Sequence, residues 1–360
     1  MMSQFPIKSI LEDKKRVFIV AEIGKNFIQK EDDLSWEEYL ENAKKLVKAA
    51  QESVADAVKF QTHNVEDEQL DVEIKSPHFD DSDRYSWVKR NTKATPIEFW
   101  QSLKKYCDDL GIIFFSTPMS RGAAKKINEL VDMWKVASSD ILDFVLLDYI
   151  AQTNKPIIIS SGMSTKEELD KAIAFLKKRT DKIILMHCVS KYPCPQDELY
   201  LDTIEYFADR YDIPVGFSDH SLGFNAAVAS IQKGACVIEK HFSLDRNFWG
   251  SDHQESMLPD EFKKMVHAIR VHSEIDSAQF GKGIKVLDKE ESAFRPIFRK
   301  SLMAGQAIAK GTVITKEMLY AMRPQKYAKG LPSEEYENVL GKKTTKDLKK
   351  YDPITSNSIN

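Results

Sequence analysis

Eight short apolar segments, each followed by a longer segment of helical period, constrain the fold of this chain more than any other feature. They start at Arg16, Ala57, Ile112, Met133, Pro156, Lys182, Pro214 and Cys236, and read RVFIVAEIG, AVKFQT, IIFFSTP, MWKVAS, PIIISSG, KIILMHC, PVGFSD and CVIEKHF. Strands that are almost entirely apolar are typical of parallel sheets covered by helices. Eight strand–helix units are the number that closes such a sheet on itself. The sequence therefore predicts an α/β fold, a (β/α)8 or TIM barrel.

The segments between these strands carry helix-start signals. Three residue pairs have the spacing of a capping box, in which each side chain bonds to the backbone N–H of the other residue. They are Ser35 with Glu38, Thr95 with Glu98, where Pro96 adds a favoured first helical residue, and Thr165 with Glu168. After the first signal, one apolar stripe is formed by Trp36, Leu40, Ala43, Val47 and Ala50. We therefore expect amphipathic helices that pack on the sheet.

One connection is much longer than the others. It runs from His63 to Ala94 and is rich in Asp, Ser and Tyr. Connections of that length are commonly lids or binding loops. We expect this connection to have one of these roles.

The composition and the predicted secondary structure of the chain change after the eighth strand–helix unit. From Phe280 onward, Gly, Lys and short β-like segments replace the long helices, and IAKGTVIT (Ile308–Thr315) weakly resembles LKKYDPIT (Leu348–Thr355). A chain of 360 residues also exceeds the size at which one core usually stops growing. The sequence therefore predicts a barrel domain at 1–279, a linker at 280–298 and a small β-rich domain at 299–360.

Composition argues against several classes of partner. The net charge is -3, and interspersed Lys and Glu form no basic stripe of the kind that follows a nucleic-acid backbone. The longest apolar segments are strand-sized, and the first residues, MMSQFPIKSILEDKK, carry acids where a signal peptide needs an apolar region. The four cysteines show no CxxC pairing. We expect no nucleic-acid partner, no membrane association, reduced cysteines and a cytoplasmic location.

Polar residues end almost every predicted strand. The C-terminal strand ends of a (β/α)8 barrel form its active-site face, so these residues should form a ring there. They are Glu22, Lys59 with Gln61, Ser116 with Thr117, Lys135 with Ser138, Ser160 with Ser161, Ser190, Ser218 with Asp219 and His220, and Glu239 with His241. Period-two alternation puts Lys59 on the same side as Gln61, and His220 on the same side as Ser218.

The residue types in this ring suggest particular chemistry, each with an alternative. Lys59 and Lys135 among hydroxyl groups suit a phosphate or a phosphorylated acid, although both could be salt-bridged structural residues. His220 and His241 suit a divalent metal ion with open coordination positions, although they could be satisfied core histidines. Glu22 could be a general acid or base, or a salt-bridge partner of a lysine.

Nine segments in this order resemble the motif series of the sialic acid synthase (N-acetylneuraminate synthase) family. They are AEIGKNF, VKFQT, FFSTPMS, KVASSDI, PIIISSGMST, LMHCVSKYPCP, VGFSDHSLG, VIEKHFSLDR and GSDHQES. The later segments RKSLMAGQAIAKGTVIT, AMRP and LGKKTTKDL resemble the antifreeze-like, or SAF, domain that closes these enzymes. The resemblance covers almost the whole chain.

The resemblance implies a metal-dependent condensation of phosphoenolpyruvate with an N-acylated amino sugar. The resemblance implies N-acetylmannosamine first, the classical acceptor of the family. It would give N-acetylneuraminate, a nine-carbon 2-keto acid, and phosphate through C–O cleavage. The metal would polarise the sugar aldehyde for attack by C3 of phosphoenolpyruvate, water would add at C2, and phosphate would leave. Glu22 is the first candidate for handling the protons of that water.

The family motifs also imply roles for individual residues. His220 and His241 would bind the metal, usually Mn²⁺, with Mg²⁺ or Co²⁺ as alternatives. Phosphoenolpyruvate would be held by Lys59, Thr117, Lys135, Ser138, Ser160, Ser190 and Ser218. The acceptor sugar and the reacting carbons would be surrounded by the catalytic group Glu22, Gln61, Asp140, Tyr192 and Asp252. Arg323, from AMRP, would reach the acceptor sugar in a partner subunit's barrel, which implies a homodimer with swapped SAF domains.

Three departures from the family pattern concern the acceptor more than phosphoenolpyruvate. The first motif reads EIGKNF where EIGxNHxG is common, Asp140 stands where Glu is common, and Ser190 stands where some members have Asn. Legionaminic and pseudaminic acid synthases share the motif series and use dideoxy diamino sugars. The DH of GSDHQES favours the sialic or legionaminic branch.

Other classes remain as alternatives. A Schiff-base aldolase or lyase would use Lys135 or Lys59 as its nucleophile and would survive metal chelation. A non-catalytic sugar-binding protein would release no phosphate with any amino sugar. An octulosonate-type synthase, which uses a sugar phosphate, should lack the SAF domain.

Overall fold

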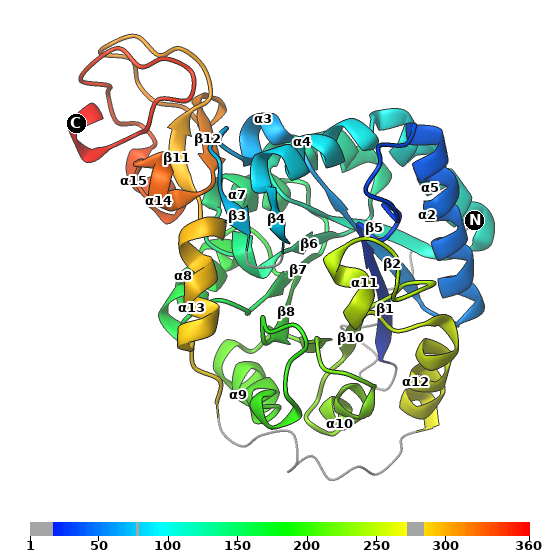
Figure 1. The fold of residues 1–360 in the computed structure, drawn as a ribbon. Coiled ribbons are helices and arrows are strands. Elements are labelled where there is room, and N and C mark those ends of the chain that lie inside the picture. Colours follow the sequence, from blue (N-terminus) through cyan, green and yellow to red (C-terminus); the bar gives the residue numbers. More distant parts are fainter. Residues whose placement is uncertain (1–16, 77–78, 272–283) are drawn as a thin grey trace.

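A closed barrel of eight parallel strands forms the centre of the molecule (Figure 1). The computed structural model describes residues 17–76, 79–271 and 284–360. Around the barrel the strands follow the order β1-β10-β9-β8-β7-β6-β5-β2. They are β1 (Phe18–Gly24), β2 (Ala57–Thr62), β5 (Ile113–Pro118), β6 (Trp134–Val136), β7 (Ile157–Ser160), β8 (Ile183–Cys188), β9 (Val215–Asp219) and β10 (Val237–His241). Each lies within a predicted segment, so the predicted TIM barrel is confirmed.

Helices surround the barrel and bury its outer face. They are α2 (Trp36–Glu52), α5 (Ile97–Leu110), α6 (Arg121–Ile127), α7 (Phe144–Gln152), α8 (Lys166–Lys177), α9 (Asp202–Tyr211), α10 (Asn225–Gln232) and α12 (Pro259–Val271), with the short α11 (Ser251–Glu255) after β10. On α2 the predicted stripe faces the barrel, since Leu40, Ala43, Val47 and Ala50 are buried and Trp36 is partly buried.

The inward-facing positions of the strands change from apolar to polar along the barrel axis. A separate apolar cluster fills the lower part of the barrel, with Phe18 and Val20 of β1 and Val237 of β10 among its members. Two residues further along the same faces stand Glu22 and Glu239. Because side chains alternate with period two, one face of each strand forms both the apolar floor and the polar ring above it.

Two of the three predicted capping boxes are present. Ser35 and Thr165 each accept a hydrogen bond from the N–H three residues on, and the Glu at that position bonds back. The pair at Thr95 is a correction. The Thr95 hydroxyl donates to Asn91 O at 2.9 Å, because that carbonyl lies one turn earlier in the preceding helix. α5 therefore starts after Pro96 without a side-chain cap.

The long connection between β2 and α5 is folded. It contains α3 (Val65–Glu68), a hairpin of β3 (Lys75–Ser76) and β4 (Phe79–Asp83), and α4 (Arg84–Ala94). Its chain pairs with the C-terminal domain, since Leu70 N donates to Arg323 O at 2.8 Å and Arg323 N donates to Glu68 O at 3.0 Å. The connection therefore fixes the backbone of Arg323.

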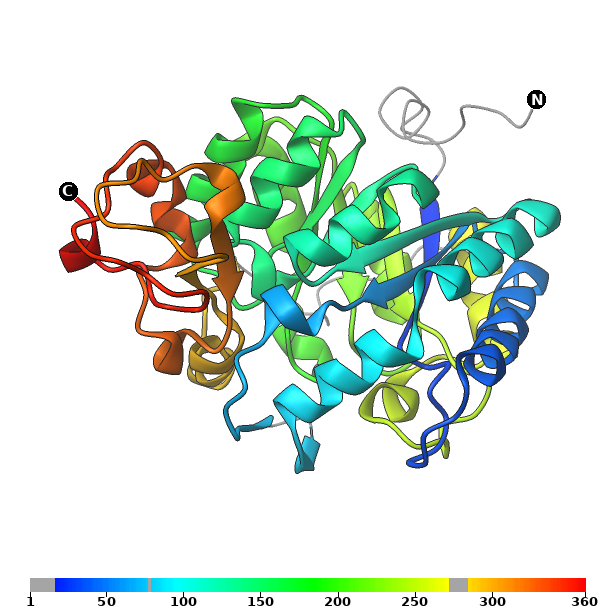
Figure 2. The same ribbon diagram turned by 90° about the horizontal axis from the view of Figure 1, so that it is seen from above.

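The C-terminal domain lies to one side of the barrel (Figure 2, orange to red). Its elements are antiparallel β11 (Ser301–Ala304) and β12 (Leu319–Met322), followed by α14 (Gln325–Ala328) and α15 (Tyr336–Val339). The two copies of the weak repeat pair through Ile308 and Leu348. Equivalent positions in the copies, Gly311 and Tyr351, both have positive φ, at 83° and 72°. The described part of the predicted linker contains a further helix, α13 (Lys289–Phe298).

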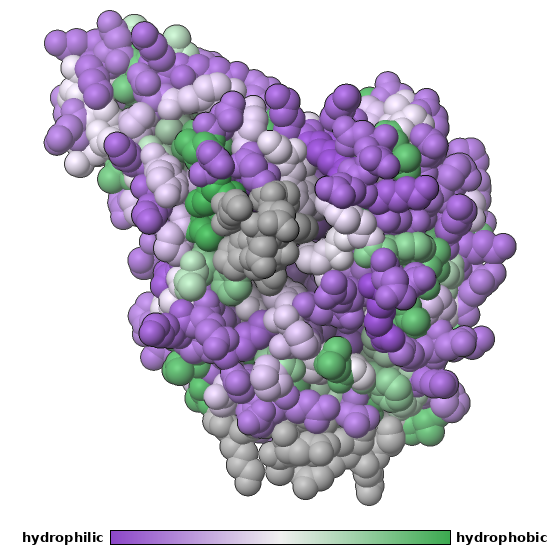
Figure 3. Space-filling model, viewed as in Figure 1, coloured by the Kyte–Doolittle hydropathy of each residue, from purple (hydrophilic) through white to green (hydrophobic). Residues whose placement is uncertain are grey.

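Within residues 17–76, 79–271 and 284–360, no helix combines the length and apolar character that crossing a bilayer requires. The face of the molecule in Figure 3 is largely hydrophilic, and its hydrophobic residues form small separate patches.

Candidate active site

A cavity of about 170 Å³ lies at the C-terminal ends of the barrel strands. Its wall contains every predicted site residue except Asp140. These residues are Glu22, Lys59, Gln61, Thr117, Lys135, Ser138, Ser160, Ser190, Tyr192, Ser218, His220, His241, Asp252 and Arg323. Most of the polar ring expected at the strand ends therefore lines the cavity. Ser116, Ser161 and Asp219 do not, because period-two alternation turns them to the other face of the barrel wall.

Two buried lysines and two buried carboxylates form the floor of the cavity. Lys59 Nζ lies 2.6 Å from Glu22 Oε2 and 3.7 Å from Glu239 Oε1. Lys135 Nζ lies 3.7 Å from the same oxygen of Glu239. The lysines are therefore salt-bridged and also line the cavity, so the structural interpretation and the anion-binding interpretation both apply to them.

Hydroxyl groups complete the floor. Lys59 Nζ donates to Thr117 Oγ1 at 3.1 Å, and Lys135 Nζ donates to Ser160 Oγ at 2.6 Å. Ser218 Oγ donates to Glu239 Oε1 at 3.0 Å. Ammonium and hydroxyl donors that converge in this way match the oxygens of a phosphate or a carboxylate.

The two carboxylates of the floor differ in their electrostatic environment. Burial raises the pKa of Glu22, and the ion pair with Lys59 offsets only part of this effect. Burial acts on Glu239 in the same direction, but Lys135 and Lys59 lower the pKa of Glu239 to about 2. When the pKa values of neighbouring carboxyl groups are pushed apart, the one with the raised pKa is suited to proton transfer. Glu239 is suited to be a permanent counter-ion.

His220 and His241 stand together beside the floor, with ring centroids 5.6 Å apart. His220 Nδ1 lies 2.8 Å from Val189 O, which leaves Nε2 for a ligand. His241 Nδ1 is buried and has no hydrogen-bond partner among the described residues. Burial lowers the pKa of His241 to about 3, so this ring is neutral.

The donor set fits a divalent cation with open coordination positions. A backbone carbonyl that orients a ligating imidazole, as Val189 does for His220, is typical of metal sites. The described residues include no group of three His, Cys, Asp or Glu side chains that could hold a metal ion. Solvent or substrate would therefore complete the coordination. Burial lowers the pKa of His220, but the negative charge of the Cys188 thiolate, whose sulfur lies 3.8 Å from Nδ1, raises it to about 9, so a metal ion would displace a proton there.

Arg323 enters the cavity from the segment that follows β12 of the same chain. It is fully buried and forms an ion pair with Asp140, and Lys300 lies 3.2 Å from the same carboxylate. The Nε and Nη1 atoms of Arg323 have no hydrogen-bond partner among the described residues. Asp140 itself does not line the cavity, contrary to the prediction, because its short side chain is buried beneath these two cations.

Several wall residues were missed by the sequence analysis. Lys25 and Arg84 line the cavity; Arg84 is 5% exposed, and its Nε has no partner among the described residues. Burial, and then the charge of Arg323, lower the pKa of Arg84 to about 10. Phe294 and Phe298 come from α13. Their spacing of four is a helical signal, whereas nothing in the sequence of the long connection points to Arg84.

Known proteins resemble this chain along most of its length. Residues 46–280 match the NeuB family, and residues 299–360 match the SAF domain. N,N'-diacetyllegionaminic acid synthase of Campylobacter jejuni is 35% identical over 344 residues, covering 93% of this chain and 98% of that protein. Human N-acetylneuraminate-9-phosphate synthase is 30% identical, covering 94% and 91%.

A solved structure is also similar to this chain over almost its whole length. The spore coat polysaccharide biosynthesis protein spsE of Bacillus subtilis has a TM-score of 0.77 and 29% identity, covering 96% of this chain and 95% of that one. The NeuB match alone spans more than half of the 360 residues. This chain therefore belongs to the NeuB family of sugar acid synthases and ends in a SAF domain.

Proposed function

We propose that this protein condenses phosphoenolpyruvate with an N-acylated amino sugar and releases phosphate. In this reaction C3 of phosphoenolpyruvate bonds to the aldehyde carbon, the oxygen of water bonds to C2, and the bond from C2 to the phosphate oxygen breaks. The products are a nine-carbon 2-keto acid and inorganic phosphate. The observation that carries the proposal is the convergence of Lys59 and Lys135 with hydroxyl donors, next to His220 and His241, in one cavity.

The floor suits the three charges of phosphoenolpyruvate. Lys59 and Lys135 would neutralise its phosphate and carboxylate, and the hydroxyls of the cavity wall would orient them. These hydroxyl groups belong to Thr117, Ser138, Ser160, Ser190 and Ser218. Glu22 would accept a proton from the attacking water, since its pKa is raised and it lies beside the lysine that holds the substrate.

His220 and His241 would hold a divalent metal ion, with Mn²⁺ preferred over Mg²⁺ or Co²⁺. When bound, the ion would supply Lewis-acid polarisation of the sugar aldehyde. The buried Nδ1 of His241, which lacks a protein partner within the described residues, supports this assignment.

The acceptor sugar would lie between Gln61, Tyr192 and Asp252 on the barrel side and Arg323 on the SAF side. N-acetylmannosamine is the first candidate, which would make N-acetylneuraminate the product. A dideoxy diamino sugar, leading to legionaminic or pseudaminic acid, is the second. The 35% identity to an N,N'-diacetyllegionaminic acid synthase favours testing this second candidate in parallel.

Phosphate release from phosphoenolpyruvate tests the reaction. We expect release in the presence of Mn²⁺ with one of the two sugar classes, and a product mass equal to that of the nine-carbon keto acid. No release with any amino sugar would overturn the proposal. Trapping of a lysine by borohydride with a keto acid, together with activity that survives chelation, would instead indicate a Schiff-base enzyme.

We also propose a homodimer in which two chains exchange their SAF domains. The contacts between Arg323 and Asp140 are here made within one chain, and domain swapping would make the same contacts between chains. Two variants test this when they are refolded together. One chain carries only Lys59→Met, and the other carries only Arg323→Ala. A swapped heterodimer contains one intact site and recovers activity, whereas an unswapped one recovers none. Light scattering gives the mass of the assembly.

A cytoplasmic location completes the proposal. Cys107, Cys188 and Cys194 form no disulfide bond, which is typical of a reducing compartment. Cell fractionation would test the location, and recovery of the protein outside the cytoplasm would contradict it.

A further inference from the structure

We propose that Glu291, on helix α13, is a positioning residue that fixes two loops of the active site. The proposal rests on the proposed function, because it assigns these loops to the phosphoenolpyruvate side of the cavity. α13 lies in the segment that the sequence suggested was a linker. The structure gives this helix a direct connection to the residues that follow β7 and β8.

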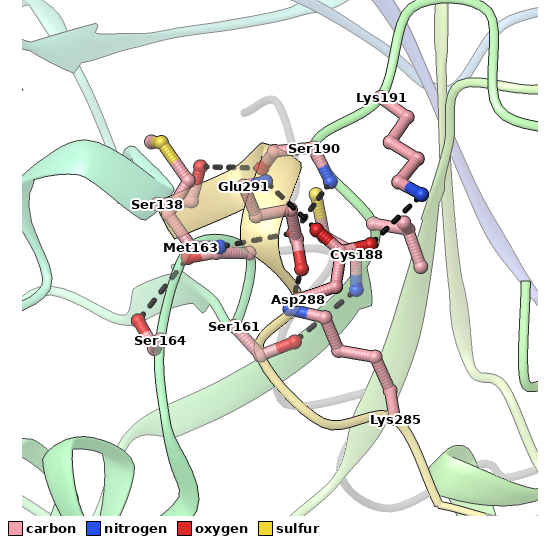
Figure 4. A network of polar contacts seen from close by, with 12 residues as sticks. Ser138, Ser161, Met163, Ser164, Cys188, Ser190, Lys191, Lys285, Asp288 and Glu291 are labelled. Atoms are coloured by element: carbon pink, nitrogen blue, oxygen red, sulfur yellow. Dashed lines mark hydrogen bonds and ion pairs between the residues drawn. The ribbon is translucent and has the colours of Figure 1, made fainter. Parts of the chain in front are cut away.

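One carboxylate oxygen joins the two loops. Glu291 Oε1 accepts a hydrogen bond from Ser190 N at 3.0 Å and another from Met163 N at 3.3 Å (Figure 4). Glu291 Oε2 lies 2.7 Å from Lys285 Nζ, and both side chains are almost completely buried. The carboxylate is therefore held by two backbone donors and one ammonium group.

The two N–H groups belong to residues that line the cavity. Met163 lies three residues after Ser160, and Ser190 lies two residues after the end of β8. Ser190 Oγ is also 3.4 Å from Ser138 Oγ (Figure 4). Through Glu291, the backbones that carry Ser160 and Ser190 are tied to each other and to α13. These hydroxyls are the proposed phosphoenolpyruvate contacts, so their separation depends on this carboxylate.

α13 is anchored at both ends to the same loops. At its start, Asp288 caps the helix by accepting from Glu291 N at 2.8 Å and pairs with Lys191, the neighbour of Ser190, at 2.8 Å. At its end, Arg299 Nη2 donates to Met163 O at 3.0 Å. The helix therefore contacts the loops at both ends, and Glu291, in its first turn, contacts both of them.

In the Glu291–Lys285 ion pair, the hydrogen-bond acceptor and the negative charge of Glu291 can be removed separately. Loss of the carboxylate oxygen would leave two buried N–H groups without an acceptor, and the loops would have to move to find one. Loss of the charge alone would leave Lys285 buried and unpaired. Variants that change the two properties one at a time can therefore distinguish them.

The decisive experiment compares two double variants. Glu291→Gln with Lys285→Met keeps an oxygen that can accept the two N–H bonds and removes both charges. Glu291→Leu with Lys285→Met removes the acceptor as well, without leaving a buried charge. Lys289→Gln, at an exposed position of the same helix, is the matched control.

We expect the KM for phosphoenolpyruvate to rise about tenfold or more in the Leu/Met variant, as loss of two buried hydrogen bonds implies. The Gln/Met variant and the control should stay within about threefold of the parent. The KM for the sugar should change much less than the KM for phosphoenolpyruvate in every variant. An unchanged KM in the Leu/Met variant would overturn the proposal and leave Glu291 a purely structural residue.

Hydrogen exchange of the Met163 and Ser190 amides provides a readout that needs no turnover. We expect faster exchange at both amides in the Leu/Met variant and parent-like exchange in the Gln/Met variant. Unchanged exchange in the Leu/Met variant would refute the positioning role even if the enzyme were active. Absence of phosphate release by the parent protein would refute the proposed function instead, while the exchange comparison would still decide the role of Glu291.

Discussion

Gly162 tests how closely the phosphate side of the cavity is packed. A Cβ at this position would lie 2.2 Å from Ser190 Oγ, 3.0 Å from Ser138 Cβ and 3.1 Å from Cys188 Sγ. The first distance is about 1.2 Å below the 3.4 Å at which ordinary contact begins. Gly162→Ala must therefore displace Ser190 Oγ or the loop that carries it.

The size of the effect follows from this displacement. Overpacking of a well-packed site costs about 1–3 kcal/mol in the free energy of unfolding. A shift of about 1 Å in a group that holds the substrate can cost on the order of 100-fold in rate. Since Ser190 is a proposed phosphoenolpyruvate contact, we expect kcat/KM for phosphoenolpyruvate to fall about 100-fold in Gly162→Ala.

Phosphate release at varied phosphoenolpyruvate measures kcat/KM, and denaturant unfolding measures stability. Ser190→Ala removes the shortest of the three contacts, so Gly162→Ala should lower kcat/KM much less in that background. Gly216→Ala is the control for overpacking alone. Its Cβ would lie 2.5 Å from Met186 Sδ, in the apolar cluster that fills the lower part of the barrel. Multiplicative effects of Gly162→Ala and Ser190→Ala, or an unchanged kcat/KM in Gly162→Ala, would refute the reasoning.

Four further predictions concern the proposed chemistry. Glu22→Ala should abolish phosphate release and keep the parental circular dichroism spectrum, and retained turnover would exclude Glu22 as the proton acceptor. The acid limb of the kcat/KM profile should lie above pH 4.5, because burial raises the pKa of Glu22 and activity is lost as pH falls through it; a limb at or below pH 4.5 would contradict this assignment. A chelator should remove activity, and Mn²⁺ should restore it, whereas His241→Ala should not respond to Mn²⁺; activity in metal-free buffer would exclude the metal. Arg84→Gln should raise the KM for the sugar about tenfold, as expected for the loss of one charged hydrogen bond, and should change the KM for phosphoenolpyruvate by less than about threefold. The reverse pattern would show that Arg84 contacts phosphoenolpyruvate and would contradict the prediction.

The barrel and its polar ring could be predicted because both depend on local sequence. The eight apolar segments are strands in the structure, and period-two alternation places Lys59 beside Gln61 and Glu239 beside His241 in the cavity wall. Burial on both faces leaves a strand little freedom in its pattern, so that pattern is easy to recognise. The metal ligands and substrate contacts remain predictions that the cavity geometry supports.

Contacts between distant segments could not be predicted in this way. Arg84 reaches the cavity because the long connection folds back over the barrel mouth, and Glu291 does so because α13 packs across two loops. Asp140 was assigned to the acceptor by its motif, but its carboxylate is occupied by Arg323 and Lys300. Each of these outcomes depends on tertiary packing between segments whose local sequence carries no signal for it.

The division of the cavity between strands and appended segments has an evolutionary consequence. The proposed donor-substrate contacts come mostly from barrel strands, whose positions are fixed by the sheet, whereas Arg84 of the long connection and Arg323 of the C-terminal domain come from segments outside it. Insertions or substitutions in such peripheral segments leave the hydrogen bonds of a sheet intact. New acceptor preferences can therefore arise by drift in these segments while the step that consumes the donor is preserved. The same separation gives protein engineers a place to randomise residues with little risk to the fold.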